Sequence, residues 1–213
     1  MDQDIEIINT NTRNEKIKNF FVNNKNKLIV ILTVIILCLF AYFFYQDYKL
    51  DKKENLANKY NVAVTKYNSD QKDNIENILK EIINSKDKTY SPLAFYFLMD
   101  KGLIQKDEIN KFFDIIINEI NLDKEIKNLT IYKKALYNSD FANENELLEI
   151  LNPVIKSESV WKLHALYLMA EYYLSKNQKQ KSKEFFEQII SLDKVNSKIK
   201  IEAQKRLRAE FSE

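Results

Sequence analysis

Residues 162–190 read KLHALYLMAEYYLSKNQKQKSKEFFEQII, and the helical pattern of the chain is clearest here. In its first half, Leu166, Ala170 and Tyr173 recur at helical spacing, so all three share one face of a helix. Its second half carries two apolar doublets, FF and II, on one stripe of a second helix. Asn177 lies between the halves and suits a turn. The stretch therefore predicts two helices that pack together across a short connection.

The same arrangement recurs along the chain at a nearly fixed interval. Apolar doublets that each begin a helical stripe lie at Ile78-Leu79, Phe112-Phe113, Leu147-Leu148 and Phe185-Phe186. Their first members, at positions 78, 112, 147 and 185, are separated by 34, 35 and 38 residues. Turn residues precede the doublets at Asn68, Gly102, Asn138 and Asn177. A period near 34 with two helices per unit is typical of tetratricopeptide repeats.

A further helix is expected upstream of each turn, over 46–67, 91–101, 124–137 and 158–175. Pro153 should end a helix over 144–152, because its ring clashes with the preceding turn. Residues 197–211 form an expected last helix, whose charged side caps the stack and whose apolar side faces the last repeat through Ile199, Ala203, Leu207 and Phe211. An irregular helical array without true repeats is the alternative.

An uncharged run, LIVILTVIILCLFAYFFY, extends from Leu28 to Tyr45. As a helix its 18 residues would be roughly 27 Å long, close to the thickness of a bilayer core. We interpret it as a transmembrane helix. A cleaved signal peptide would have a shorter polar segment before it, and a buried soluble helix would have partner elements on both sides. The Lys and Arg residues on the two flanks of this run only weakly favour a cytoplasmic N-terminus.

One Gly and two Pro among 213 residues argue against a sheet fold, which needs frequent turns. The predicted fold class is all-α, with one N-terminal transmembrane helix followed by a tetratricopeptide-like α-solenoid of helical hairpins. The expected domains are a cytoplasmic N-terminal segment over 1–27, the transmembrane helix over 28–45, and the helical-repeat domain over 46–213. Charges of both signs are interspersed through the repeat domain, so we expect no nucleic-acid partner.

The residues that enzymes require are scarce. The chain has one His, one Gly and one Cys, so neither a two-His metal motif nor a glycine-rich phosphate loop is available. Cys38, which lies inside the apolar run, is the only cysteine, so a disulfide within the chain is excluded. We therefore expect no catalytic residue, no cofactor, no metal and no small-molecule substrate.

The candidate partner-binding residues are His164, Tyr167, Glu171 and Leu174. In repeat numbering they fall on the face that usually lines the concave groove of a tetratricopeptide array, where an extended peptide or a partner helix would bind. The alternative is that His164 and Tyr167 simply pack against the preceding repeat. Trp161 is expected to be a core residue.

Three stretches resemble one bacterial family. They are IKNFFVNNKNKLIVILTVIILCLFAYFFYQDY (17–48), LANKYNVAV (56–64) and KTYSPLAFYFLM (88–99). They are similar to the tetratricopeptide-repeat-like ancillary subunit of the bacterial Sec translocon, a single-pass inner-membrane family. The resemblance implies a cytoplasmic N-terminus, a periplasmic C-terminal domain, and partners among the translocon, periplasmic chaperones and exported proteins.

The leading hypothesis is a non-enzymatic, membrane-anchored protein-interaction module that is accessory to export. Two rivals have the same architecture. One is a cell-envelope scaffold that binds wall-synthesis or division proteins, and the other is a cytosol-facing tetratricopeptide receptor.

Overall fold

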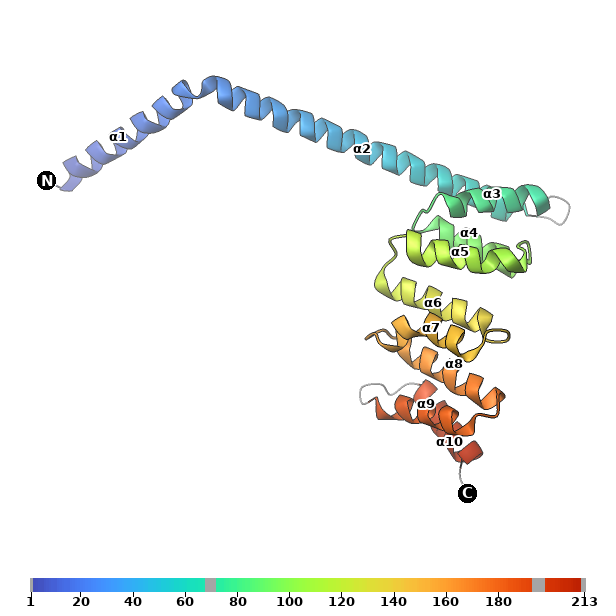
Figure 1. The fold of residues 1–213 in the computed structure, drawn as a ribbon. Helices are drawn as coiled ribbons and strands as arrows, with labels where there is room; N and C mark the ends of the chain where they lie inside the picture. Colours follow the sequence, from blue (N-terminus) through green and yellow to red (C-terminus); the bar gives the residue numbers. More distant parts are fainter. Residues whose placement is uncertain (1, 68–71, 193–197, 212–213) are drawn as a thin grey trace. The chain divides into compact units, whose positions relative to one another are not determined.

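The computed structural model describes the backbone of residues 2–67, 72–192 and 198–211, and the side chains of these residues except 2–12 and 72–73. All regular structure within these ranges is helical. The helices are α1 (Asp2–Asn23), α2 (Lys25–Thr65), α3 (Lys72–Asn84), α4 (Tyr90–Asp100), α5 (Lys106–Glu119), α6 (Lys124–Asn138), α7 (Glu144–Ile155), α8 (Lys162–Ser175), α9 (Lys179–Ser191) and α10 (Lys198–Phe211) (Figure 1). The all-α prediction is confirmed for the described residues.

The chain divides into two compact units, residues 1–55 and residues 56–213. In the first unit, the apolar part of α2 is long enough to cross a membrane, and none of its 18-residue apolar window is buried. Sequence reasoning separated a span over 28–45 from a helix over 46–67, but α2 is one continuous helix. The reason is that 46–55 contains neither Gly nor Pro, so nothing interrupts the backbone hydrogen bonds.

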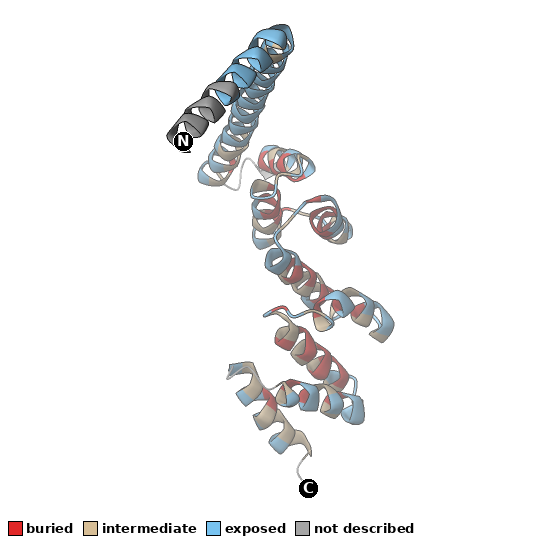
Figure 2. Ribbon diagram, turned by 90° about the vertical axis from the view of Figure 1, so that its left-hand side faces the viewer, coloured by how far each residue is buried: buried red, intermediate tan, exposed pale blue. Residues whose placement is uncertain are grey.

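The second unit is a stack of helices in which each packs against its neighbours in sequence. Its core includes residues from each predicted doublet, and the buried residues lie where neighbouring helices pack together, with α8 buried on two sides (Figure 2). Phe95, Phe113 and Phe186 are fully buried. In α10, Ala203 is buried as expected, and Ile199, Leu207 and Phe211 pack against the same cluster.

Small residues allow the closest helix pairs to form. Ser182 of α9 is fully buried, and its hydroxyl donates a hydrogen bond to the Ala170 carbonyl of α8 at 2.8 Å. Ser91 of α4 does the same toward α3, where it donates to the Ile82 carbonyl at 2.8 Å. α4 packs more extensively on α3 than on α5, so the hairpins are less regular than the period suggests.

Two turn assignments are confirmed by the backbone. Gly102 and Asn177 both have positive φ, at 60° and 58°. After each, the next amide reaches back five residues: Leu103 N–H donates to the Leu98 carbonyl, and Gln178 N–H donates to that of Tyr173, both at 2.9 Å. This pattern satisfies carbonyls at the helix end and favours residues that tolerate the left-handed region.

Three assignments need correction or fall outside the description. Pro153 does not end its helix, since α7 continues to Ile155. Pro153 lies in the last turn of α7, so the hydrogen bond that a proline cannot donate is one of the last in the helix. The turn continues past it, and Lys156 N–H donates to the Asn152 carbonyl at 3.0 Å. Asn138 is the last residue of α6 rather than a turn residue. Asn68 lies outside the described residues.

Candidate functional site

The four residues predicted to bind a partner lie on α8, and each is half-buried. His164 faces the preceding repeat. Its ring lies 5.7 Å from that of Tyr132 on α6 and 4.9 Å from that of Trp161, measured between centroids. Tyr132 and Trp161 also stack at 5.8 Å. Trp161 and His164 therefore both pack against the preceding repeat at the edge of the core, and the assignment of His164 as a partner-binding residue stays a prediction.

Tyr167 and Glu171 face α10 instead. The Arg206 guanidinium forms an ion pair with Glu171, with Nε 2.9 Å from Oε1, and Nη2 donates to Oε2 at 3.2 Å. The Tyr167 ring packs edge-on against Phe186 at 5.5 Å, and burial raises the pKa of its hydroxyl. Glu171 thus contacts α10 and Tyr167 contacts α9, and the assignment of both as partner-binding residues stays a prediction. Leu174 is half-buried at the end of α8.

A groove lies among α5, α6 and α7. Its volume is about 670 Å³. Its lining residues are Asn110, Asp114, Ile117, Asn118, Ile131, Lys134, Asn138, Phe141, Ala142, Glu146, Glu149, Ile150 and Pro153. Both α5 and α7 pack on α6, but these two helices do not pack against each other, and this leaves the groove open between them. We call it the α5–α7 groove.

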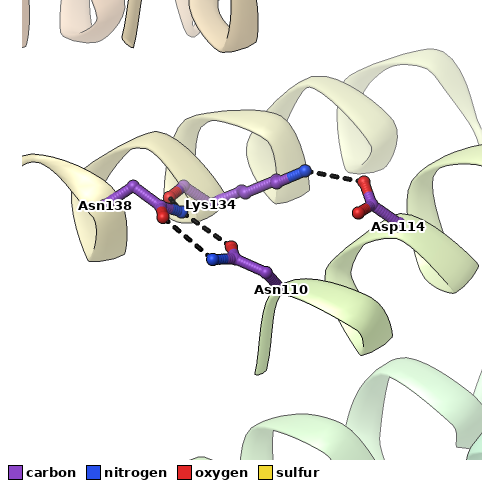
Figure 3. A network of polar contacts seen from close by, with 4 residues as sticks. All are labelled: Asn110, Asp114, Lys134 and Asn138. Carbon is purple, nitrogen blue, oxygen red and sulfur yellow. Dashed lines mark hydrogen bonds and ion pairs between the residues drawn. The ribbon is translucent and has the colours of Figure 1, made fainter. Parts of the chain in front are cut away.

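The side of the groove between α5 and α6 is fixed by a polar network (Figure 3). Asn110 and Asn138 exchange two amide hydrogen bonds, at 3.0 and 2.8 Å. The second amide hydrogen of Asn138 goes to the Lys134 carbonyl at 2.7 Å. One turn away, Lys134 Nζ lies 2.6 Å from Asp114 Oδ1. These paired contacts hold α5 and α6 in register and make the wall rigid.

The α7 side of the groove is acidic and partly apolar. Its helix begins with a capping box, in which the Asn143 side chain accepts from Glu146 N–H and the Glu146 carboxylate accepts from Asn143 N–H. Glu149 lies one turn further along and is exposed. Phe141 precedes the helix, and its side chain is 62% exposed despite its size. Large exposed aromatic side chains in a concave surface are common where proteins bind partners.

Ion pairs also link the later repeats. Lys181 of α9 lies 2.8 Å from both carboxylate oxygens of Glu144 on α7. Hydrogen bonds from Lys181 and Tyr173 lower the pKa of the Glu144 carboxyl. Glu144 precedes Ser182 by 38 residues, the same interval that separates the doublets at 147 and 185, so it occupies the position that the small Ser182 fills in the last repeat. The structure shows how the larger residue is accommodated, because its carboxylate points to a lysine of the next repeat.

Only weak signals in the sequence indicate the α5–α7 groove. Asn138 resembled a turn residue, and Phe141 fell in a stretch that was expected to be a connection. The reciprocal Asn110–Asn138 contact joins residues 28 apart, which no local pattern reveals. Among the residues that the structure describes, no group of three or more His, Cys, Asp or Glu side chains could hold a metal ion.

Comparison with known families identifies a tetratricopeptide repeat-like domain at residues 18–109. The matched region includes the apolar run and continues through α3 and α4 into α5. No curated protein and no solved structure matches the chain. A tetratricopeptide-like helical repeat is typically a non-catalytic protein-interaction module, and nothing in the described residues indicates catalysis.

Proposed function

We propose that this chain is a single-pass membrane protein whose helical-repeat domain binds protein partners at the membrane surface, as an accessory to the Sec translocon. The observation that carries the proposal is the combination of two features in one chain. The 18-residue apolar window of α2 has no buried residue, and a tetratricopeptide-like domain overlaps and follows it. An apolar helix that the protein itself leaves uncovered is favoured in lipid.

Anchoring has a direct consequence for binding. A domain restricted to a membrane surface meets other membrane proteins at a raised effective concentration, so a weak interface suffices. We propose the arrangement 1–27 in the cytoplasm, 28–45 in the inner membrane and 46–213 in the periplasm. The resemblance of 17–48, 56–64 and 88–99 to the ancillary translocon subunit supports this arrangement, with periplasmic chaperones and exported chains as further partners.

Photo-crosslinking in cells tests the proposal. One probe replaces Val34, which is exposed in the apolar part of α2, and another replaces Phe141 at the α5–α7 groove. A control probe replaces Glu187, an exposed residue of α9 outside the groove. We expect translocon channel adducts from position 34, and exported chains or periplasmic chaperones from position 141 but not from 187.

Other adducts would identify a rival. Wall-synthesis or division proteins at position 141 would indicate a cell-envelope scaffold. Cytosolic proteins at position 141, with no translocon adduct at position 34, would indicate a cytosol-facing receptor. Either result would refute the export assignment, although the anchored helical-repeat architecture would stand.

A further inference from the structure

The α5–α7 groove carries more negative charge than its own cations neutralise. Its lining holds three carboxylates, on Asp114, Glu146 and Glu149, and one ammonium, on Lys134. The lining therefore has a formal net charge of −2, and Lys134 is already held by Asp114. Within the described ranges, Glu149 has no ion-pair partner. A concave surface with excess charge of one sign attracts ligands of the other sign.

The groove also has an apolar part that a purely ionic ligand would not use. Phe141 is mostly exposed, Pro153 is exposed and Ile150 is half-buried, and all three line the groove together with Glu149. A ligand that places an apolar group beside a cationic group would cover this surface and pair with the carboxylate at once.

The polar wall adds a feature suited to a polypeptide. Asn110 donates one amide hydrogen to Asn138, and its second amide hydrogen has no acceptor among the described residues. An amide has two donors, and a backbone carbonyl is a suitable acceptor for the second one. The groove is lined by three helices, so it can accept a run of residues rather than a single side chain.

From these observations we propose that the α5–α7 groove binds a cationic, partly apolar segment of a partner protein. Its Lys or Arg side chains pair with Glu149 and the neighbouring carboxylates, and its apolar side chains pack on Phe141. The proposal rests on the function proposed above, and it names the chemistry of the partner that the domain receives. Nucleic acid has the wrong sign of charge for this groove.

The test uses the full chain in nanodiscs of zwitterionic lipid, so that the bilayer itself does not attract cations. The probe is a fluorescein-labelled 16-residue peptide of Lys, Leu and Ser, compared with the same pattern in which Glu replaces Lys. Binding is followed by fluorescence anisotropy, and empty nanodiscs give the background. We expect the Lys peptide to bind and the Glu peptide not to bind, and we expect salt to weaken the complex.

Variants then locate the site. Glu149→Lys changes the local charge by two units within a few ångströms of the ligand and should weaken binding about tenfold. Phe141→Ser should weaken it several-fold through lost apolar contact. The matched control, Glu187→Lys, makes the same charge change on an exposed part of α9 and should leave affinity within about twofold. Circular dichroism confirms that each variant is folded.

Three results would overturn the inference. One is equal binding of the Lys and Glu peptides. Another is equal weakening by Glu149→Lys and Glu187→Lys, which would mean general electrostatic attraction without a site. The third is displacement of the bound Lys peptide by a second, unlabelled copy of the chain, which would assign the groove to self-association. Because the crosslinks from position 34 do not depend on this groove, its failure and the failure of the proposed function are distinguishable.

Discussion

Substitution of Phe95 by Ala is the sharpest probe of the repeat core. Phe95 lies on α4 and is fully buried. Its ring contacts that of Phe113 edge-on, with centroids 4.7 Å apart, and lies 6.1 Å from that of Phe112. One side chain therefore joins α4 to α5, the two consecutive helices between α3 and α10 that pack least extensively.

The expected loss follows from this geometry. Truncating a fully buried Phe to Ala typically costs about 3 to 5 kcal/mol, because the transfer free energy is lost and a cavity remains. The edge-on contact with Phe113 accounts for about 1 kcal/mol of this. Leu93 of the same helix is 42% exposed and serves as the matched control. Leu93→Ala should cost less than about 1 kcal/mol, since Ala is a good helix former and little buried area is lost.

Urea denaturation followed by circular dichroism at the helix band measures both variants. With a slope of about 2 kcal/mol per molar urea, Phe95→Ala should lower the midpoint by about 2 M and Leu93→Ala by less than about 0.5 M. A shift below about 0.5 M for Phe95→Ala, or equal shifts for the two variants, would refute the packing described for α4 and α5.

Three further outcomes are expected. Gly102→Ala should cost about 1 kcal/mol in a urea titration, because φ is +60° there while an added Cβ would meet no atom within 4 Å; a loss above about 3 kcal/mol would contradict this. The pKa of Glu144 is lowered in the fold, so its stabilisation is present above the unfolded value near 4.5 and is lost as the pH falls through the folded value. Glu144→Gln should therefore be less stable than the parent at pH 7, and the difference should vanish as the pH falls below the folded value, whereas a constant difference would be the contrary result. Arg206→Ala should raise hydrogen exchange in α10 alone, whereas unchanged exchange there would show that the ion pair with Glu171 does not hold the helix.

Periodicity was sufficient to predict the helical core. A doublet such as Phe112-Phe113 lies on the apolar stripe of its helix, and that stripe is the side that packs on the core. Its burial can therefore be predicted from the local sequence alone. The turns at Gly102 and Asn177 were likewise predictable, since a left-handed backbone conformation at a helix end strongly favours Gly and Asn. Such features depend on residues close together in the chain.

The site depended on contacts that local patterns do not encode. The interpretation of His164, Tyr167 and Glu171 as groove residues rests on repeat numbering and stays a prediction. The structure adds a contact that no local pattern predicts, because Arg206 of α10 pairs with Glu171, 35 residues earlier in the chain. The α5–α7 groove arises because α5 and α7 do not pack against each other, and this is a property of the assembled helices.

The central claim is that α2 anchors the repeat domain in a membrane, and alkaline extraction of isolated membranes tests it most directly. The parent chain should stay in the membrane pellet at high pH. A double variant, Ile31→Lys with Ile35→Lys, places two charges in the apolar run, each costing about 3 kcal/mol at the centre of a bilayer, and should be released into the supernatant. Extraction of the parent chain itself by alkali would contradict the claim, because it would mean that the apolar part of α2 does not reside in lipid.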